Sequence, residues 1–85
     1  MYPQSLENSI KKLFWSTPDH LRQNLSQEAI VEQTLNFGNA QDVRALLNWL
    51  GIDLTAFIFY KQISGTRNNY HKRTRHYFEL YFARH

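Results

Sequence analysis

The sequence predicts an all-α protein, a single helical domain over residues 1–85 that forms a small bundle of about five helices. With 85 residues the chain has room for one hydrophobic core. Its three glycines and two prolines are too few for the many turns that a strand-rich protein needs. Apolar residues also recur at intervals of three and four along most of the chain, a spacing typical of amphipathic helices.

The first helix is expected over residues 5–15. Ser5 can cap its N-terminus, and four apolar side chains follow in one stripe: Leu6, Ile10, Leu13 and Phe14. Pro18 ends this region, because proline disfavours a helical conformation of the preceding residue and lacks an amide hydrogen. The segment 19–25 is ambiguous and fits one short turn with two apolar anchors, Leu21 and Leu25.

A second helix is expected over residues 27–36, capped by Ser26. Its inner face consists of Ile30, Val31, Thr34, Leu35 and Phe37. Gly38 fits a left-handed C-terminal stop. The third helix follows at once, with Asn39 as its cap and Asp42 in the favoured acidic position three residues later. Its apolar stripe is the clearest in the chain and consists of Val43, Leu46, Leu47 and Leu50.

Gly51 ends the third helix, and Asp53 can cap a fourth that runs to about residue 63. A strand over residues 55–60 remains an alternative, because that segment is rich in β-forming residues. Residues 64–69 are the most loop-like stretch. A fifth helix is expected over residues 70–83, with Tyr70, Thr74, Tyr77, Phe78, Tyr81 and Phe82 on one broad side. The third to fifth helices together form a candidate helix-turn-helix variant.

The charge of the chain is unevenly distributed. Residues 1–60 contain four basic and six acidic side chains, a net charge of −2. Residues 61–85 contain six basic side chains and one acidic side chain, a net charge of +5, which brings the total to +3. A mildly acidic body that ends in a basic, aromatic segment indicates an anionic partner.

The residue patterns of common enzymes are missing, so we expect no enzymatic activity and no cofactor. There is no glycine-rich phosphate loop, no histidine pair at metal-ligand spacing on a helix and no nucleophile-elbow pattern. Small helical ribonucleases carry an arginine and a histidine separated by four to six residues, which neither Arg67–His71 nor Arg75–His76 matches. Cysteine is absent. No apolar run approaches the ~20 residues that cross a bilayer, and the first residues do not open a signal peptide, so a cytoplasmic protein without membrane contact is expected.

The strongest functional signal is the segment from Arg67 to Phe82. Arginine matches the geometry of phosphates and carboxylates, and flat rings stack on unpaired bases. The candidate partner- or nucleic-acid-binding residues are Arg67, Lys72, Arg73, Arg75 and His76. The alternative interpretation is structural: Phe78 and Phe82 would then lie in the core, and the charges would only solvate the outer side. Trp15 and Trp49 each follow an apolar stripe and are expected in the core or at its rim.

Several segments of the sequence resemble one family. They are Leu13-Phe14-Trp15, Ile30-Val31-Glu32, Phe37-Gly38-Asn39-Ala40-Gln41-Asp42-Val43, Leu46-Leu47-Asn48-Trp49-Leu50-Gly51 and Arg73-Thr74-Arg75-His76-Tyr77-Phe78-Glu79-Leu80-Tyr81-Phe82. This pattern resembles short bacterial and archaeal proteins encoded beside nucleotidyltransferase-like toxins of the AbiEii type, and the resemblance covers residues 13–82. It implies an antitoxin. The chain departs from the family pattern at Asn39, His71-Lys72 and His76.

These observations lead to two hypotheses. The first is an antitoxin-like protein that binds and neutralises a cognate toxin, with the nucleotidyltransferase type implied by the resemblance. The alternative is a DNA-binding transcriptional regulator with a basic C-terminal helix, and a homodimer is compatible with both. A nucleic-acid mimic would need an acidic surface, which the net charge of +3 opposes.

Overall fold

The computed structural model of the protein describes residues 2–22, 24–65 and 68–84. All regular secondary structure in these ranges is helical. The elements are the 3-10 turn η1 (Gln4–Leu6) and the helices α1 (Glu7–Leu13), α2 (Asp19–Arg22), α3 (Gln27–Phe37), α4 (Ala40–Leu50), α5 (Ile52–Ile63) and α6 (Lys72–Ala83). No strand occurs within those ranges. The all-α prediction is confirmed, and residues 55–60 belong to a helix.

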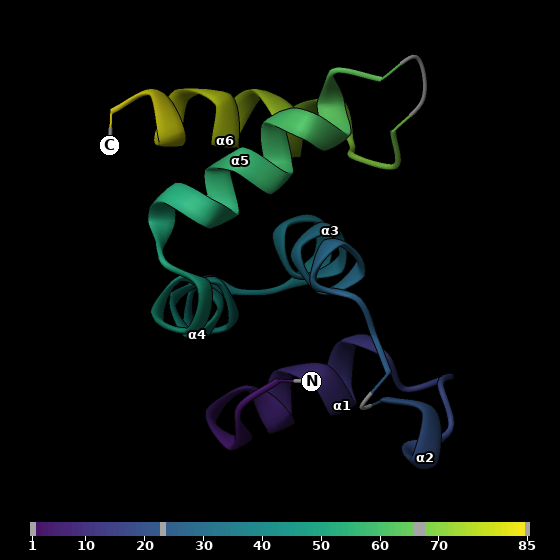
Figure 1. Ribbon diagram of the computed structural model, residues 1–85. Coiled ribbons are helices and arrows are strands. Elements are labelled where there is room, and N and C mark those ends of the chain that lie inside the picture. Colours follow the sequence, from purple (N-terminus) through teal and green to yellow (C-terminus); the bar gives the residue numbers. More distant parts are fainter. Residues whose placement is uncertain (1, 23, 66–67, 85) are drawn as a thin grey trace.

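The helices are arranged in three levels along the molecule (Figure 1). η1 and α1 lie at one end, α3 and α4 in the middle, and α5 and α6 at the other end. α4 and α5 are bent by 107° relative to each other and are joined by Gly51 alone. That angle is typical of a helix-turn-helix, although such motifs have a turn of three or four residues.

Two of the four predicted N-caps are confirmed. The Ala29 amide donates to the Ser26 hydroxyl over 3.1 Å at the start of α3. At the start of α4, the Asp42 amide donates to Asn39 Oδ1 over 3.0 Å, and the Asn39 amide donates to Asp42 Oδ2 over 2.8 Å. The other two caps are wrong: Ser5 lies inside η1, and Asp53 is in the first turn of α5, which has no side-chain cap.

The two glycines at the ends of α4 are required for different reasons. Gly51 has φ of +82° and ψ of 154°, a region that is open almost only to glycine. Gly38 has φ of −77°, so the predicted left-handed stop is wrong. Its glycine is explained by space, since a Cβ atom there would lie 2.6 Å from the Thr34 carbonyl oxygen and 2.9 Å from Asp42 Cβ.

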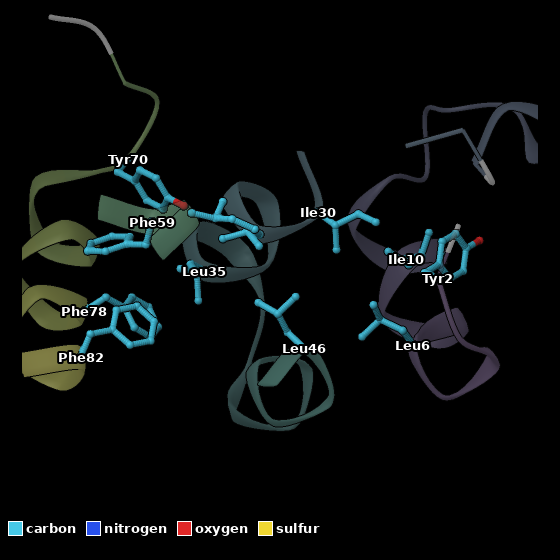
Figure 2. Close-up of a cluster of buried hydrophobic side chains, with 12 residues drawn as sticks. Tyr2, Leu6, Ile10, Ile30, Leu35, Leu46, Phe59, Tyr70, Phe78 and Phe82 are labelled. Carbon is cyan, nitrogen blue, oxygen red and sulfur yellow. The ribbon is translucent and has the colours of Figure 1, made fainter. Parts of the chain in front are cut away.

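One hydrophobic core runs through all three levels (Figure 2). Its composition changes along the way. Aliphatic side chains of η1 and α1 fill one end together with Tyr2, and Ile30, Leu35 and Leu46 fill the middle. The other end is aromatic, with Phe59 surrounded by the rings of Tyr60, Tyr70, Phe78 and Phe82 at centroid distances of 5.2 to 6.2 Å.

Three apolar residues that we expected inside lie outside. Trp15 is 80% exposed, Phe37 is 57% exposed and Leu21 is 45% exposed. Trp15 follows the end of α1, where the backbone leaves the helix at Phe14 with φ of −120° and ψ of 40°. Trp15, which we expected in the core or at its rim because it follows an apolar stripe, therefore does not continue the buried side of α1. Trp49 does pack against the core, as expected.

Asp42 is the most buried carboxylate for which burial is described and connects α4 to α1. It accepts hydrogen bonds from the Ser9 hydroxyl over 2.5 Å and from Lys12 Nζ over 2.6 Å, besides the Asn39 amide. Burial raises the pKa of the Asp42 carboxyl, but the hydrogen bonds from Lys12, Ser9 and Asn39 and the charge of Lys12 outweigh burial. The pKa is therefore below its ordinary value of 3.8, and the carboxylate is ionised at neutral pH.

Among the described residues, no single helix combines the length and apolar composition needed to cross a membrane; only α4 and α5 taken together, with the bend between them, reach those criteria.

Candidate binding site: a cationic cleft between α4 and α6

Hydrogen bonds to α3 position the segment that leads into α6. The Asn36 side chain donates to the Asn69 carbonyl over 2.9 Å and accepts from the His71 amide over 3.2 Å. The Asn69 side chain in turn donates to Glu32 over 3.1 Å. Because these side chains bind the backbone around residue 70, α6 begins at Lys72 rather than at Tyr70 as predicted.

Tyr70 is nevertheless a core residue. Its ring packs edge-on against Phe59, and its hydroxyl donates to Gln62 Oε1 over 2.5 Å. Burial, with a smaller contribution from the charge of Glu32, raises the pKa of Tyr70 above its ordinary value, so the hydroxyl stays protonated. Phe78 and Phe82 are buried as well. These rings attach α6 to α5, and the outer side of α6 carries charged residues together with the exposed Leu80.

The candidate site residues do not all lie together. Lys72, Arg73 and His76 are exposed on the outer side of α6, within a sector of about 100° given the ~100° rotation per residue of a helix. No carboxylate within the described ranges pairs with any of these three. Arg75 lies about 160° from Arg73 around the helix axis and donates from Nε to Glu79 over 3.2 Å. Arg67 lies outside the described residues.

Arg73, at the edge of this sector, also lines a cleft between α6 and α4, on whose other wall is Arg44. The cleft has a volume of about 550 Å³, within the range of ordinary ligand pockets. We call it the α4–α6 cleft. Its lining residues are Leu35, Gly38, Asn39, Ala40, Val43, Arg44, Leu47, Arg73, Thr74, Tyr77, Phe78 and Tyr81. There is no carboxylate among them.

The cleft combines two kinds of binding surface. Val43, Leu47 and Phe78 supply apolar contact area, while the guanidinium groups of Arg44 and Arg73 can hold carboxylate or phosphate through paired hydrogen bonds. The ring of Tyr77, which is 60% exposed, is stacked with that of Tyr81 at an interplanar angle of 13°. Such a site suits an anionic group attached to an apolar or aromatic body.

Arg44 is the residue of this site that sequence reasoning missed. It lies in the acidic part of the chain, and the pairing of α4 with α6 is not encoded in any local pattern. The only sequence signal is its position beside the apolar stripe of α4, since it is one residue from Val43 and three from Leu47.

A second, shallower groove lies near the N-terminal end and includes the exposed rings of Trp15 and Phe37 together with Lys12. The ring of Phe37 contacts the His71 ring edge-on, with 5.3 Å between their centroids. No group of three histidine, aspartate or glutamate side chains in the described ranges is placed to hold a metal ion.

Comparison of the chain with protein-family models, with curated proteins and with solved structures gave no match.

Proposed function

We propose that the protein is an antitoxin-like binding protein, which neutralises a partner toxin by covering part of its surface. The observation that carries this proposal is the α4–α6 cleft, where Arg44 and Arg73 face an apolar groove and neither guanidinium is paired with a described carboxylate. The nucleotidyltransferase type of the toxin comes from the sequence resemblance. Such enzymes bind metal and nucleotide with acidic side chains, which are suitable partners for the two arginines.

The surface is large enough for this function. An ordinary protein–protein interface covers ~800 Å² on each partner, or roughly a seventh of the 5898 Å² surface of this protein. Its exposed residue types also match those that dominate binding energy at interfaces, namely arginine, tyrosine and tryptophan. Arg44, Arg73 and Tyr77 supply the first two around the cleft, and Trp15 supplies the third near the N-terminal end.

The test is co-expression with the product of the neighbouring gene, which the resemblance implies is a nucleotidyltransferase-like toxin, with growth and co-purification as readouts. The wild-type chain is expected to restore growth and to co-purify. The double variant R44E/R73E should lose both, because two interface arginines at ~2 kcal/mol each correspond to roughly a thousandfold loss of affinity. Arg84→Glu is the matched control, since Arg84 is exposed next to the end of α6 and does not line the cleft. Failure of the wild type in both readouts would reject the proposal.

A second candidate function is DNA binding, which is favoured by the outer side of α6. Lys72, Arg73 and His76 lie there without described acidic partners. α5, in contrast, directs Leu54, Phe57 and Tyr60 outward and so is not suited to read base edges. If DNA is bound, α6 is therefore the helix that contacts it.

The two functions can be separated by one pair of variants. DNA binding through α6 predicts an affinity for duplex DNA that falls steeply with salt, as phosphate contacts require. Lys72→Glu should weaken DNA binding and leave the toxin complex intact, because Lys72 does not line the cleft. Arg44→Glu should do the reverse. No measurable DNA binding at low salt would reject this second function.

A further inference from the structure

α5 is apolar on two opposite sides, although only one of them is buried in the protein. Thr55, Ile58 and Phe59 form its buried side. Leu54, Phe57 and Tyr60 follow one another at intervals of three residues on its outer side, where they are 39%, 64% and 40% exposed. Tyr60 is partly covered by α6, because its ring lies near that of Phe82 and its hydroxyl donates to the Glu79 carbonyl over 3.4 Å. A helix that is apolar all round is normally covered all round. The outer side of α5, which we call the α5 stripe, is therefore only partly covered in the single chain, and Phe57 at its centre is the most exposed of the three.

Two opposite charges flank this stripe symmetrically. Asp53 lies four residues before Phe57 and Lys61 lies four residues after it, about one helical turn on each side. Both side chains are exposed, and neither has an ion pair among the described residues. The stripe therefore has a negative end, an apolar centre and a positive end.

This pattern is self-complementary in one orientation, and we infer that the occupant of the α5 stripe is a second copy of the chain, packed antiparallel about a two-fold axis at Phe57. In that register Phe57 faces Phe57 of the other copy, and Leu54 faces its Tyr60. Asp53 of each copy faces Lys61 of the other, which gives two ion pairs. A parallel arrangement would place Asp53 against Asp53 and Lys61 against Lys61, which the like charges oppose.

The size of the surface sets the expected strength. α5 has 12 residues, so it is about 18 Å long, and one side of such a helix is smaller than the ~800 Å² per partner of a stable complex. We therefore expect a reversible dimer with a dissociation constant of about 10–100 µM. The stripe shares no residue with the α4–α6 cleft, so the dimer can be tested independently of the proposed function.

The first experiment is sedimentation velocity of the whole protein from about 5 to about 500 µM, a range that brackets the affinity expected for a small interface. The wild type should shift from monomer to dimer. Phe57→Asp should abolish the dimer, because it places two carboxylates at the two-fold axis. Phe37→Asp is the matched control: Phe37 is a similarly exposed phenylalanine, at 57%, and lies on α3 outside the stripe. It should dimerise like the wild type.

The second experiment tests the antiparallel register by exchanging charges. Asp53→Lys and Lys61→Asp should each weaken the dimer by about tenfold or more, because each creates two like-charge contacts. The double variant D53K/K61D should recover the wild-type affinity, which a mere loss of folding would not allow. An equimolar mixture of the two single variants should form a mixed dimer, since every facing pair is then of opposite charge.

Several results would overturn the inference. These are a wild-type chain that stays monomeric over the whole range, a dimer that survives Phe57→Asp, and a double charge exchange that restores nothing. Binding of the monomer to lipid vesicles through Phe57, without dimerisation, would also overturn it and identify a membrane surface as the cover of the stripe.

Discussion

The outermost helices at the two ends of the molecule are attached to their neighbours by different forces. At the N-terminal end, α1 is linked to α4 through the buried carboxylate of Asp42, which binds Ser9 and Lys12. At the aromatic end, α6 is attached to α5 mainly through the rings of Phe78 and Phe82 around Phe59. The one resolved pair of charges on α6, Arg75 with Glu79, is exposed and lies within the helix itself.

This difference determines which charges remain for a partner. At the N-terminal end the ion pair is part of the fold, because Asp42 is almost fully buried and its hydrogen bonds satisfy it there. At the aromatic end the rings provide the attachment, so Arg73 can face the cleft and Lys72 can face solvent without a structural task. The ion pair of the buried Asp42 with Lys12 therefore stabilises the fold at the N-terminal end, whereas Lys72 and Arg73 at the aromatic end remain able to bind a partner.

The largest expected effect on the free energy of unfolding comes from removing the Phe59 ring from the aromatic end of the core. Phe59 is fully buried and touches four other rings. Phe59→Ala should lower the free energy of unfolding by about 3–5 kcal/mol, since it removes a large apolar side chain and leaves a cavity. Urea unfolding monitored by circular dichroism measures this. Phe57→Ala, on the exposed side of the same helix, should change it by no more than about 0.5 kcal/mol at low protein concentration. Equal losses would contradict the assigned core.

The next effect comes from the N-terminal end. Asp42→Asn should lower the free energy of unfolding at pH 7 by about 1–3 kcal/mol, because Ser9, Lys12 and the Asn39 amide lose a charged acceptor. This is expected to be less than for Phe59→Ala, since the side chain of Lys12 is half exposed and water can solvate it.

The pH dependence follows from the lowered pKa of Asp42. The folded state holds the carboxylate ionised to lower pH than the unfolded state, so the stabilisation is complete above the ordinary value of 3.8 and is lost as pH falls through the folded-state pKa. The difference in stability between wild type and D42N should therefore shrink below about pH 4. Phe59→Ala should keep the acid dependence of the wild type. A difference that stays constant down to pH 2 would contradict the role of Asp42.

Local rules were sufficient to predict most of the fold. The cap at Ser26 and the reciprocal pair of Asn39 and Asp42 depend on residues three positions apart, and both occur as expected. The inward positions of Phe78 and Phe82 follow from helical spacing alone. The expectation for Trp15 was wrong: it follows the apolar stripe of the first helix in the sequence, but α1 ends at Leu13 and Trp15 is 80% exposed.

The candidate site was less accessible to sequence reasoning because it depends on how distant helices pack. The pattern identified Arg73 but gave no reason to connect it with Arg44, which is 29 positions earlier. It also treated Arg75 as equivalent to Arg73, whereas Arg75 donates a hydrogen bond to the Glu79 side chain one helical turn later. The role of Gly38 was likewise hidden, since the atoms that exclude a side chain there include Asp42 Cβ, brought close only once α4 has formed.

Gly38, which lies between α3 and α4, provides a further test of the environment of Asp42. Gly38→Ala should cost about 1–3 kcal/mol, because its Cβ would crowd the Thr34 carbonyl and Asp42. It should also displace the Asp42 carboxylate, whose Oδ2 would lie 3.2 Å from that Cβ, and raise the pKa of Asp42 toward 3.8. Gly51→Ala should cost a similar amount through its positive φ yet leave the Asp42 pKa unchanged. Titration followed by NMR distinguishes the two.

The smallest effect comes from two fully buried threonines, one in α3 and one in α5 at the aromatic end. The Thr34 hydroxyl has no hydrogen-bond partner among the described residues, whereas the Thr55 hydroxyl donates to the Gly51 carbonyl over 2.7 Å. Thr34→Val should therefore raise the free energy of unfolding by up to about 1 kcal/mol, since it removes an unsatisfied polar group. Thr55→Val should lower it by about 1 kcal/mol through the lost hydrogen bond. Valine and threonine have similar helix propensities, so opposite signs in urea unfolding would separate a satisfied buried hydroxyl from an unsatisfied one, and equal signs would contradict the assignment.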